Sequence, residues 1–339
     1  MKNLLITGWV PEYMLAPHRN YFNITSPDEK KENFSMDEVK KIINGNDAIF
    51  TYSAFPFRKE LVDFAGSIKI AANNGVGYDN IDAPYCTKKG IFVLNTPKSV
   101  CEPTAEFSIA LTLAITRGVF MYDRDLRKKR KCVSVQFFDR DIILMGKTLG
   151  ILGYGRIGQA VGRKARGLGL KVIYYDPVRR TPEQEMEQGV AYADFEELIK
   201  TADVISCHMP YTPENRHIIN IETFRKMKRT AYFVNVARGP IMCEKDLVEA
   251  LETGLIRGAA TDVFEFEPDV SKELAAIENV IITPHIASMA MEVRRNMVDE
   301  IIGGMKDIFE GMRPPNVVNK ELWEPLETPV GFPENTQPD

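Results

Sequence analysis

A glycine-rich turn between an apolar strand and a helix is the feature that most limits how this chain can fold. The sequence runs from Thr148 through Leu-Gly-Ile-Leu-Gly-Tyr-Gly-Arg-Ile to Gly158, and a second apolar strand follows and ends at Asp176. In such a turn one glycine allows the tight bend, one lets the backbone approach a pyrophosphate, and one lets helix and strand pack closely. The helix N-terminus then faces the phosphates, and the acid accepts hydrogen bonds from a ribose. The pattern predicts a dinucleotide site formed by Gly153, Gly155, Arg156, Ile157, Gly158 and Asp176.

The acid at the end of the second strand predicts which dinucleotide binds. The Asp176 carboxylate would repel a phosphate on the 2′-oxygen of the adenosine ribose, so NAD(H) is expected and NADP(H) is less favoured. Arg179 and Arg180 follow closely and could soften that preference. The alternative for both arginines is an ordinary solvated position on the surface.

Short apolar runs alternate with helical patterns along the chain, which is typical of α/β folds with parallel sheets. The length of 339 residues suits about two domains. We predict two doubly wound parallel-sheet domains. Residues 100–287 form the dinucleotide-binding domain, and residues 1–99 and 288–339 together form a discontinuous second domain. Predicted strands cover residues 4–7, 48–52, 68–72 and 91–94, and then 148–152, 171–175, 204–207, 231–236, 258–261 and 280–283.

Helix signals support this division. Ser35 and Glu38 have the spacing of a capping box, and a long helical pattern opens at Glu102-Pro103. A helix from Met291 to Glu310 would return the chain to the first domain. The last fifteen residues carry four prolines and no periodicity, and predict a poorly ordered tail.

Composition argues against several classes of partner. The formal net charge of −4 gives no electrostatic reason to expect nucleic acid or an anionic membrane. No run approaches the roughly 20 apolar residues that a membrane helix needs. The five cysteines are scattered and never form a C-x-x-C pair, which argues against a disulfide framework or a zinc site. A cytoplasmic protein without a metal is expected.

Three polar residues follow successive predicted strands of the second domain, where open α/β sheets bind ligands. They are Arg238, Glu267 and His285. An arginine can hold a carboxylate and polarise a carbonyl, and a histidine can donate or accept a proton near neutral pH. A nearby carboxylate would orient the histidine and favour its protonated form. Singly, the three could be a turn residue, a loop acid and a packed histidine. Together they predict a site for hydride transfer between a nicotinamide and a carbonyl.

The chain resembles the D-isomer-specific 2-hydroxyacid dehydrogenase family, which includes glyoxylate and hydroxypyruvate reductases. The resemblance covers about residues 70–290, and Tyr211 and Thr261 stand where leucine is common. It implies a Rossmann NAD-binding domain inserted in a flavodoxin-like substrate domain. The matching stretches are Asn74-Gly-Val-Gly-Tyr-Asp-Asn-Ile-Asp82, Asn95-Thr-Pro97, Leu152-Gly-Tyr-Gly-Arg-Ile-Gly158, Met209-Pro-Tyr-Thr-Pro213, Asn235-Val-Ala-Arg-Gly239, Asp262-Val-Phe-Glu-Phe-Glu-Pro268 and Thr283-Pro-His-Ile-Ala-Ser288.

The resemblance also implies roles at the reacting centre. Arg238 would bind the substrate carboxylate and carbonyl oxygen, His285 would be the acid/base, and Glu267 would be its partner. The backbone amides of Val76 and Gly77 would cradle the substrate carboxylate, and a plain loop is the alternative reading of that glycine-rich stretch.

Further residues would lie at the cofactor. Asp262 would hold the nicotinamide carboxamide, and Thr104 would lie near the nicotinamide. His208, Pro210 and Ala237 also fall at strand ends near the cofactor, although packing is the favoured reading of His208.

The resulting hypothesis is an NAD(H)-dependent dehydrogenase that works mainly as a reductase of small 2-oxoacids of the glyoxylate or hydroxypyruvate type. Residues of about 119–146 resemble an arm through which family members dimerise, so a homodimer is expected. Their basic run would then be a solvated helix face. Phe55 and Phe57 could form an apolar wall of the substrate pocket or belong to the core. Two alternatives stay open: an NAD-sensing scaffold of the corepressor kind, and a short phosphoglycerate dehydrogenase.

Overall fold

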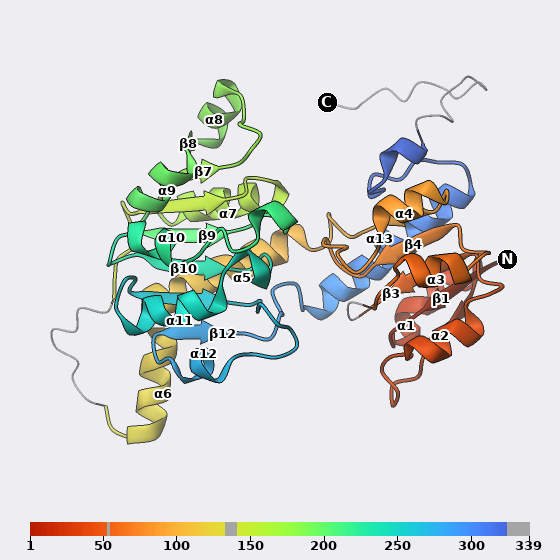
Figure 1. Cartoon of the computed structure of the whole chain (residues 1–339), viewed down its shortest axis with the longest axis horizontal. Coiled ribbons are helices and arrows are strands. Elements are labelled where there is room, and N and C mark those ends of the chain that lie inside the picture. Colours follow the sequence, from red (N-terminus) through yellow and green to blue (C-terminus); the bar gives the residue numbers. More distant parts are fainter. Residues whose placement is uncertain (53–54, 133–140, 324–339) are drawn as a thin grey trace. The chain divides into compact units, whose positions relative to one another are not determined.

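The described chain divides into two compact units. The structure is a computed structural model that describes residues 1–52, 55–132 and 141–323 (Figure 1). One unit comprises Met1–Val100 and the chain from Ala290 onward, and the other comprises Cys101–Met289. The predicted C-terminal tail lies entirely outside the described residues.

The first unit is built on a five-stranded parallel sheet in the order β2-β1-β3-β4-β5. This is the strand order of flavodoxin-like folds. The edge strand β2 was not predicted, because its sequence Phe-Asn-Ile-Thr has only two apolar residues and alternates between buried and exposed positions. The strands are β1 (Lys2–Ile6), β2 (Phe22–Thr25), β3 (Ala48–Thr51), β4 (Ile70–Asn73) and β5 (Phe92–Leu94).

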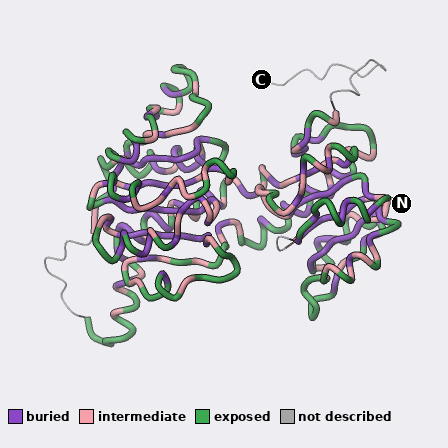
Figure 2. The backbone as a smooth tube through the Cα atoms, in the orientation of Figure 1, coloured by how far each residue is buried: buried purple, intermediate pink, exposed green. Residues whose placement is uncertain are grey.

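Helices cover both faces of this sheet because successive strand residues point to opposite sides. In β1, Leu4 and Ile6 join a core with α1 and α13, whereas Leu5 joins a core with α2, α3 and α4. The strands are the most buried part of the unit (Figure 2). The helical elements are α1 (Glu12–Leu15), η1 (Ala16–His18), α2 (Met36–Ile42), α3 (Lys59–Phe64), α4 (Ala83–Lys88), α13 (Met291–Phe309) and η4 (Lys320–Leu322).

Two sequence predictions about this unit have clear outcomes. The capping box is confirmed, since the Ser35 hydroxyl accepts the Glu38 N–H and the Glu38 carboxylate accepts the Ser35 N–H. Phe57 is fully buried and Phe55 nearly so, and both belong to the core with α2, α3 and α4. Of the two readings of Phe55 and Phe57, a pocket wall or part of the core, the structure supports the core.

The second unit carries a seven-stranded parallel sheet in the order β12-β11-β10-β9-β6-β7-β8. The chain reverses direction across the sheet between β6 and β9, which is where doubly wound sheets bind ligands. Only the two-residue edge strand β8 was not predicted. The strands are β6 (Thr148–Leu152), β7 (Lys171–Tyr175), β8 (Ala191–Tyr192), β9 (Val204–Cys207), β10 (Tyr232–Asn235), β11 (Gly258–Thr261) and β12 (Val280–Ile282). The predicted class, two doubly wound parallel sheets, is confirmed.

Alternating residues of β10 pack into two cores on opposite faces of the sheet. Tyr232 and Val234 pack with α5 and α7, and Phe233 between them packs with α10 and α11 on the other face. The long helix α5 is therefore a core element of this unit. The helical elements are α5 (Cys101–Thr116), α6 (Val119–Lys129), α7 (Arg156–Gly167), α8 (Pro182–Gln188), α9 (Phe195–Thr201), η2 (Pro213–Asn215), α10 (Ile221–Lys226), η3 (Gly239–Ile241), α11 (Glu244–Glu252) and α12 (Lys272–Ala276).

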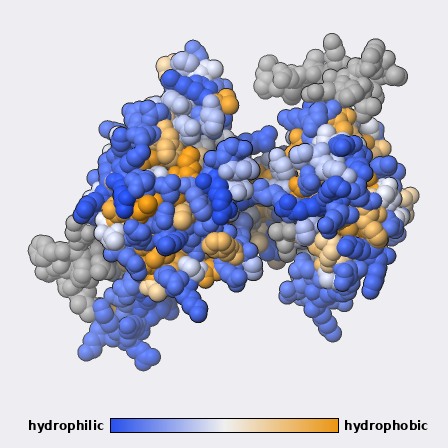
Figure 3. Space-filling view, viewed as in Figure 1, coloured by the Kyte–Doolittle hydropathy of each residue, from blue (hydrophilic) through white to orange (hydrophobic). Residues whose placement is uncertain are grey.

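Helix α6 carries the basic run. Its charges pair along the helix, Arg127 with Asp123 and Lys129 with Asp125, and its surface is hydrophilic (Figure 3). This fits the predicted solvated face. Part of the predicted arm, residues 133–140, lies outside the described residues. No single helix in the described part of the chain is long and apolar enough to cross a membrane; only α5 and α6 taken together, across a bend of 58°, meet the length and composition required.

The segment after α13 is tied to β5 by a buried asparagine. The Asn319 Oδ1 accepts the Val93 N–H at 2.8 Å, and its Nδ2 donates to the Ile91 carbonyl at 2.9 Å and the Thr87 hydroxyl at 3.0 Å. The Asn319 side chain thus pairs two buried backbone groups at the edge strand β5, the Val93 N–H and the Ile91 carbonyl.

We predict that Asn319→Ala lowers the free energy of unfolding by about 2 kcal/mol or more, because it leaves a buried donor and a buried acceptor unpaired. Chemical denaturation of the full chain measures this loss. The control is Asn23→Ala, which removes an exposed amide bonded only to Asn3 in an exposed contact, and should change stability by less than about 0.5 kcal/mol. Equal effects of the two substitutions would contradict the role given to Asn319.

Candidate functional site

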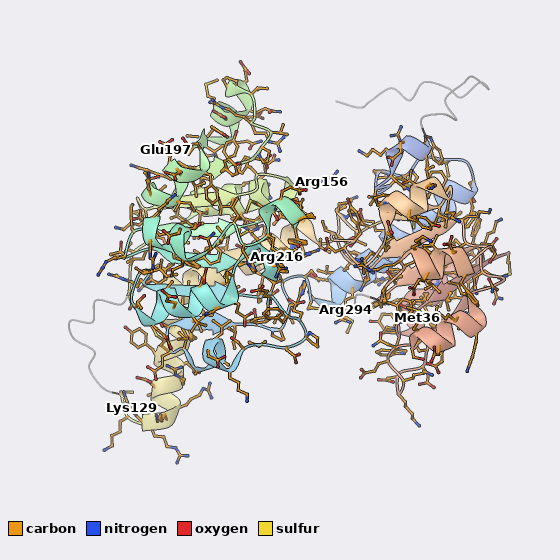
Figure 4. All side chains as sticks on the ribbon, viewed as in Figure 1. Met36, Lys129, Arg156, Glu197, Arg216 and Arg294 are labelled. Atoms are coloured by element: carbon orange, nitrogen blue, oxygen red, sulfur yellow. The ribbon has the colours of Figure 1, made fainter. Side chains whose placement is uncertain are left out.

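The glycine turn after β6 is shaped for a ligand at the start of α7. Gly153 has a φ of +89°, and Gly158 lies so close to it that a Cβ there would be 2.2 Å from the Gly153 oxygen. A Cβ on Gly155, by contrast, would meet nothing within 4 Å. Gly155 is the N-cap residue of α7 and offers no side-chain cap, and Arg156 (labelled in Figure 4) opens the helix. An open cradle at an uncapped helix N-terminus fits a pyrophosphate.

Asp176 lies beside this turn at the end of β7. Its two carboxylate oxygens accept the N–H groups of Tyr154 at 2.8 Å and Val178 at 2.9 Å. Each oxygen has a further lone pair, so the carboxylate can still accept hydrogen bonds from a ribose. The glycine turn and Asp176, both predicted to bind the dinucleotide, thus lie side by side at the carboxyl ends of β6 and β7.

The two arginines that follow Asp176 are not simply solvated. Arg179 makes two hydrogen bonds with the Glu185 carboxylate, at 2.9 and 3.0 Å, and lies over the Tyr192 ring. Arg180 donates to the Tyr154 carbonyl at 2.8 Å. Arg179 is exposed, as the surface reading predicts, and Arg180 is partly buried. Both also brace the loop that carries Asp176.

Arg238, Glu267 and His285 follow β10, β11 and β12, which are neighbouring strands. The His285 Nδ1 and Glu267 Oε2 atoms are 2.9 Å apart, and the second Glu267 oxygen accepts the Phe264 N–H at 2.9 Å. The Arg238 guanidinium donates to the Ala237 carbonyl at 2.7 Å. The fold therefore brings together the three residues that the sequence singled out.

The protonation state of Glu267 follows from this environment. Burial acts to raise the pKa of the Glu267 carboxyl, but the hydrogen bond and charge of His285 outweigh it, helped by the Phe264 N–H and the charge of Arg238. The net effect lowers that pKa below its ordinary value. Glu267 is therefore a carboxylate at neutral pH, with its Oε2 atom facing the His285 ring.

A buried carboxylate holds the segment on both sides of His285. Asp262 is fully buried, and it accepts hydrogen bonds from the Thr283 hydroxyl at 2.6 Å, the Ile286 N–H at 2.9 Å and the Ala287 N–H at 2.8 Å. Burial raises the pKa of the Asp262 carboxyl, although these bonds and the nearby His285 oppose the rise. His285 itself has a left-handed backbone with a φ of +54°. Such a conformation persists only where its surroundings enforce it.

The loop that carries Glu267 is packed against the turn that carries Arg238. A Cβ on Gly239 would lie 1.8 Å from the Phe264 oxygen, so only glycine allows this contact. Sequence reasoning did not identify Gly239 or Thr283 as parts of the site, although both stand inside the matching stretches. Their importance comes from contacts between loops, which a single sequence does not show.

The His208 ring contacts a serine hydroxyl, which agrees with the packing reading, and its predicted place near the cofactor stays a prediction. Its Nε2 lies 2.8 Å from the Ser206 hydroxyl, which in turn lies 3.0 Å from the Ser108 hydroxyl. Burial lowers the pKa of His208 to about 3, so the ring is neutral. Its backbone lies against Gly153, where a Cβ would be 2.9 Å from the His208 oxygen.

The remaining predicted cofactor residues also belong to the second unit. Thr104 is buried in the first turn of α5, and Ala237 is buried after β10. The Pro210 carbonyl accepts the Asn215 amide at 2.7 Å.

Val76 and Gly77 lie in the other unit, in the loop after β4. The carbonyl side of this loop is anchored: the Asn95 amide donates to the Val76 oxygen at 2.7 Å, and the Asn73 amide donates to the Gly77 oxygen. The Thr96 N–H donates to the Gly75 oxygen at 3.1 Å. A loop with its carbonyls held in this way can present its N–H groups to an anion.

Comparison with known proteins decides the family. Residues 109–287 match the model of the D-isomer specific 2-hydroxyacid dehydrogenase NAD binding domain. The chain is 37% identical to a glyoxylate reductase of Thermococcus litoralis, over 94% of this chain and 97% of the relative. The chain belongs to the D-isomer-specific 2-hydroxyacid dehydrogenase family. It is accordingly an NAD-dependent oxidoreductase of the class that acts on CH–OH groups.

Other members of this 2-hydroxyacid dehydrogenase family agree in sequence and fold. A glyoxylate reductase of Korarchaeum cryptofilum is 38% identical over 94% of this chain and 96% of its own length. The crystal structure of a glyoxylate reductase from Paecilomyes thermophila has a TM-score of 0.84 at 29% identity, covering 94% of this chain and 99% of that one. A D-lactate dehydrogenase from Aquifex aeolicus, solved with NAD and lactic acid, has a TM-score of 0.80 at 30% identity, covering 94% and 99%.

The hydrogen bonds that Asp262 accepts lead to a testable prediction. Asp262→Asn replaces one acceptor with an amide donor, which would face a backbone N–H and loosen the segment around His285. We expect kcat to fall by about 10–100-fold, as for a small misplacement of a reacting group. The matched control is Asp269→Asn in the same loop, where the side chain is exposed; steady-state kinetics should show little change. An unchanged kcat in Asp262→Asn would contradict the positioning role.

Proposed function

We propose that this dehydrogenase works mainly as a reductase of small 2-oxoacids of the glyoxylate or hydroxypyruvate type, with His285 as the acid/base. The observation that carries the proposal is the 2.9 Å contact between His285 Nδ1 and the ionised Glu267 carboxylate, beside Arg238. With Nδ1 bonded to Glu267, the other ring nitrogen is available to a substrate. The names of two relatives, both glyoxylate reductases, support the substrate class.

The cofactor would be held by the elements around the glycine turn. Gly153, Gly155 and Gly158 with the start of α7 would hold the pyrophosphate, and Asp176 would bind the adenosine ribose. Thr104, Pro210 and Ala237 remain candidates for contacts nearer the nicotinamide. Bound NADH supplies the hydride that reduces the carbonyl.

The chain's own residues would perform the remaining steps. The Arg238 guanidinium binds the substrate carboxylate and polarises the carbonyl. The N–H groups of Val76 and Gly77 remain candidates for holding a substrate carboxylate. The protonated His285 ring donates its proton to the developing alkoxide, and in the reverse direction the neutral ring accepts it. Glu267 stays ionised throughout and stabilises the charged ring.

The proposal also covers the oligomeric state, the cellular compartment and the choice of cofactor. We propose a homodimer formed through residues of about 119–146, of which α6 is the described helical part. The five cysteines are free, which supports a reducing cytoplasmic setting. A preference for NAD(H) over NADP(H) is supported by the position of Asp176.

Two other functions make different predictions. An NAD-sensing scaffold would bind NADH and turn over no 2-oxoacid, whereas a short phosphoglycerate dehydrogenase would oxidise phosphoglycerate. Steady-state assays of NADH oxidation with glyoxylate, hydroxypyruvate, pyruvate and longer 2-oxoacids separate them. We expect turnover with the smaller substrates, and the absence of turnover with every 2-oxoacid would overturn the proposed function.

His285→Ala should lower kcat for 2-oxoacid reduction by about 10²–10⁴-fold, because the general acid is lost. Binding of NADH, measured by fluorescence titration, should change little, since the predicted cofactor contacts lie elsewhere. His18→Ala is the matched control, because His18 is a histidine of the other unit, paired with Asp299. Retained activity in His285→Ala would remove the proposed acid/base role.

Glu267→Gln should shift the pH profile of reduction. Reduction needs the protonated ring, so kcat/KM falls as the pH rises. Because the Glu267 carboxylate stabilises that protonated ring, its removal should move the fall to lower pH. Measuring kcat/KM for glyoxylate across the pH range in parent and variant checks this. A profile that moves to higher pH, or does not move, would contradict the assigned role of Glu267.

A further inference from the structure

A second cluster of chemically reactive side chains lies outside the dehydrogenase site. His217 stands in the loop before α10, Cys243 is the N-cap residue of α11, and Glu265 lies in the loop after β11. Their imidazole, thiol and carboxylate ligand atoms all lie within 4.8 Å of one another. Nothing in the proposed reaction uses these three groups.

The backbone holds His217 and Cys243 in place. The His217 N–H donates to the Pro240 carbonyl at 3.0 Å, and the Cys243 N–H donates to the Ile219 carbonyl at 2.9 Å. The two segments thus pair as a short parallel ladder. His217 has a left-handed φ of +53°, a strained conformation for a residue with a side chain. The strain is maintained by this ladder, and it directs the ring toward Glu265.

Glu265 is a buried carboxylate. Its side chain is only 5% exposed, and one of its oxygens lies 2.6 Å from the His217 Nε2 and 2.9 Å from an Arg216 nitrogen. Glu244, also buried, accepts the N–H of Glu265, and its own N–H donates to the Glu265 carboxylate. Two buried carboxylates therefore meet beside the cysteine. Such a concentration of negative charge in a partly dry site favours a cation.

The donor set predicts which cation. Imidazole nitrogen, thiolate sulfur and carboxylate oxygen together suit zinc, whereas calcium and magnesium prefer oxygen alone. Zinc ligands lie about 2.0–2.3 Å from the ion, so they stand about 3.3–3.8 Å apart. The three ligand atoms here lie within 4.8 Å of one another, and a bound ion would take the place of the Arg216 guanidinium (labelled in Figure 4) at the Glu265 oxygen. Its guanidinium is half exposed, which leaves it room to move.

We propose that His217, Cys243 and Glu265 form a binding site for a zinc-like divalent cation, with water as the fourth ligand. Because Glu265 lies in the same loop as Glu267, the bound ion would also tether the loop that carries the partner of His285. The site is distinct from the dehydrogenase centre and does not depend on the proposed substrate.

Metal binding would have to displace a proton from the thiol. Burial raises the pKa of the Cys243 thiol, with Asp246 and Glu265 acting in the same direction, against a backbone hydrogen bond to Asp246. Titrations are therefore best made at about pH 8, where proton competition is weaker than at neutral pH.

The test uses the full chain treated with a chelator and titrated with Co²⁺, whose bond to a thiolate gives a charge-transfer absorption. We expect one Co²⁺ per chain with this absorption, displaced by Zn²⁺. Cys243→Ser should abolish the absorption and weaken Zn²⁺ binding by about 100-fold or more, since losing even an outer-shell partner costs about 10–100-fold. The matched control is Cys132→Ser, which removes an exposed thiol elsewhere and should bind as the parent does.

Thermal unfolding gives an independent readout. Zn²⁺ should raise the Tm of the parent and of Cys132→Ser, but not of Cys243→Ser. If Cys243→Ser does not fold, His217→Asn replaces it, because asparagine tolerates the left-handed backbone and its side chain is too short to reach the ion. The proposal is overturned if Cys243→Ser binds Co²⁺ with an unchanged absorption, or if the parent shows no thiolate absorption at all.

Discussion

The candidate site depends on the buried carboxylate of Asp262. A carboxylate placed in the core is costly unless donors satisfy it, and here the donors are the Thr283 hydroxyl and the N–H groups of Ile286 and Ala287. All three stand within two residues of His285. The segment cannot shift without leaving a buried charge unsatisfied, so His285 is held in its left-handed conformation at the end of β12.

The local environment shifts the pKa values of three titratable groups of the second unit in different directions. Burial dominates at Asp262 and raises its pKa, whereas the neighbouring His285 and Arg238 lower the pKa of Glu267. His208 is partly buried, and desolvation of its ring lowers its pKa to about 3. One histidine is therefore poised beside a carboxylate, and the other is a neutral packing residue. Opposed shifts of this kind are typical of acid/base sites.

A single loop connects these features. Between β11 and α12 it contributes Asp262 to the support of His285, Glu265 to the cluster with His217 and Cys243, and Glu267 to the His285 ring. Its approach to Gly239 leaves no room for a side chain there. The binding of a cation at Glu265 would therefore act on the same loop that carries Glu267, two residues away.

The sequence by itself determined the alternation of strands and helices, the glycine turn with Asp176, and the identity of Arg238, Glu267 and His285, because each depends on local pattern or on position at a strand end. It missed the edge strands β2 and β8, which are short and weakly apolar. Only the tertiary structure decided that Asp262 supports the His285 segment, that Phe55 and Phe57 belong to a core, and that His217 meets Cys243 and Glu265. These contacts join loops distant in sequence, and their energies come from burial and hydrogen bonding that exist only once the sheet has brought those loops together.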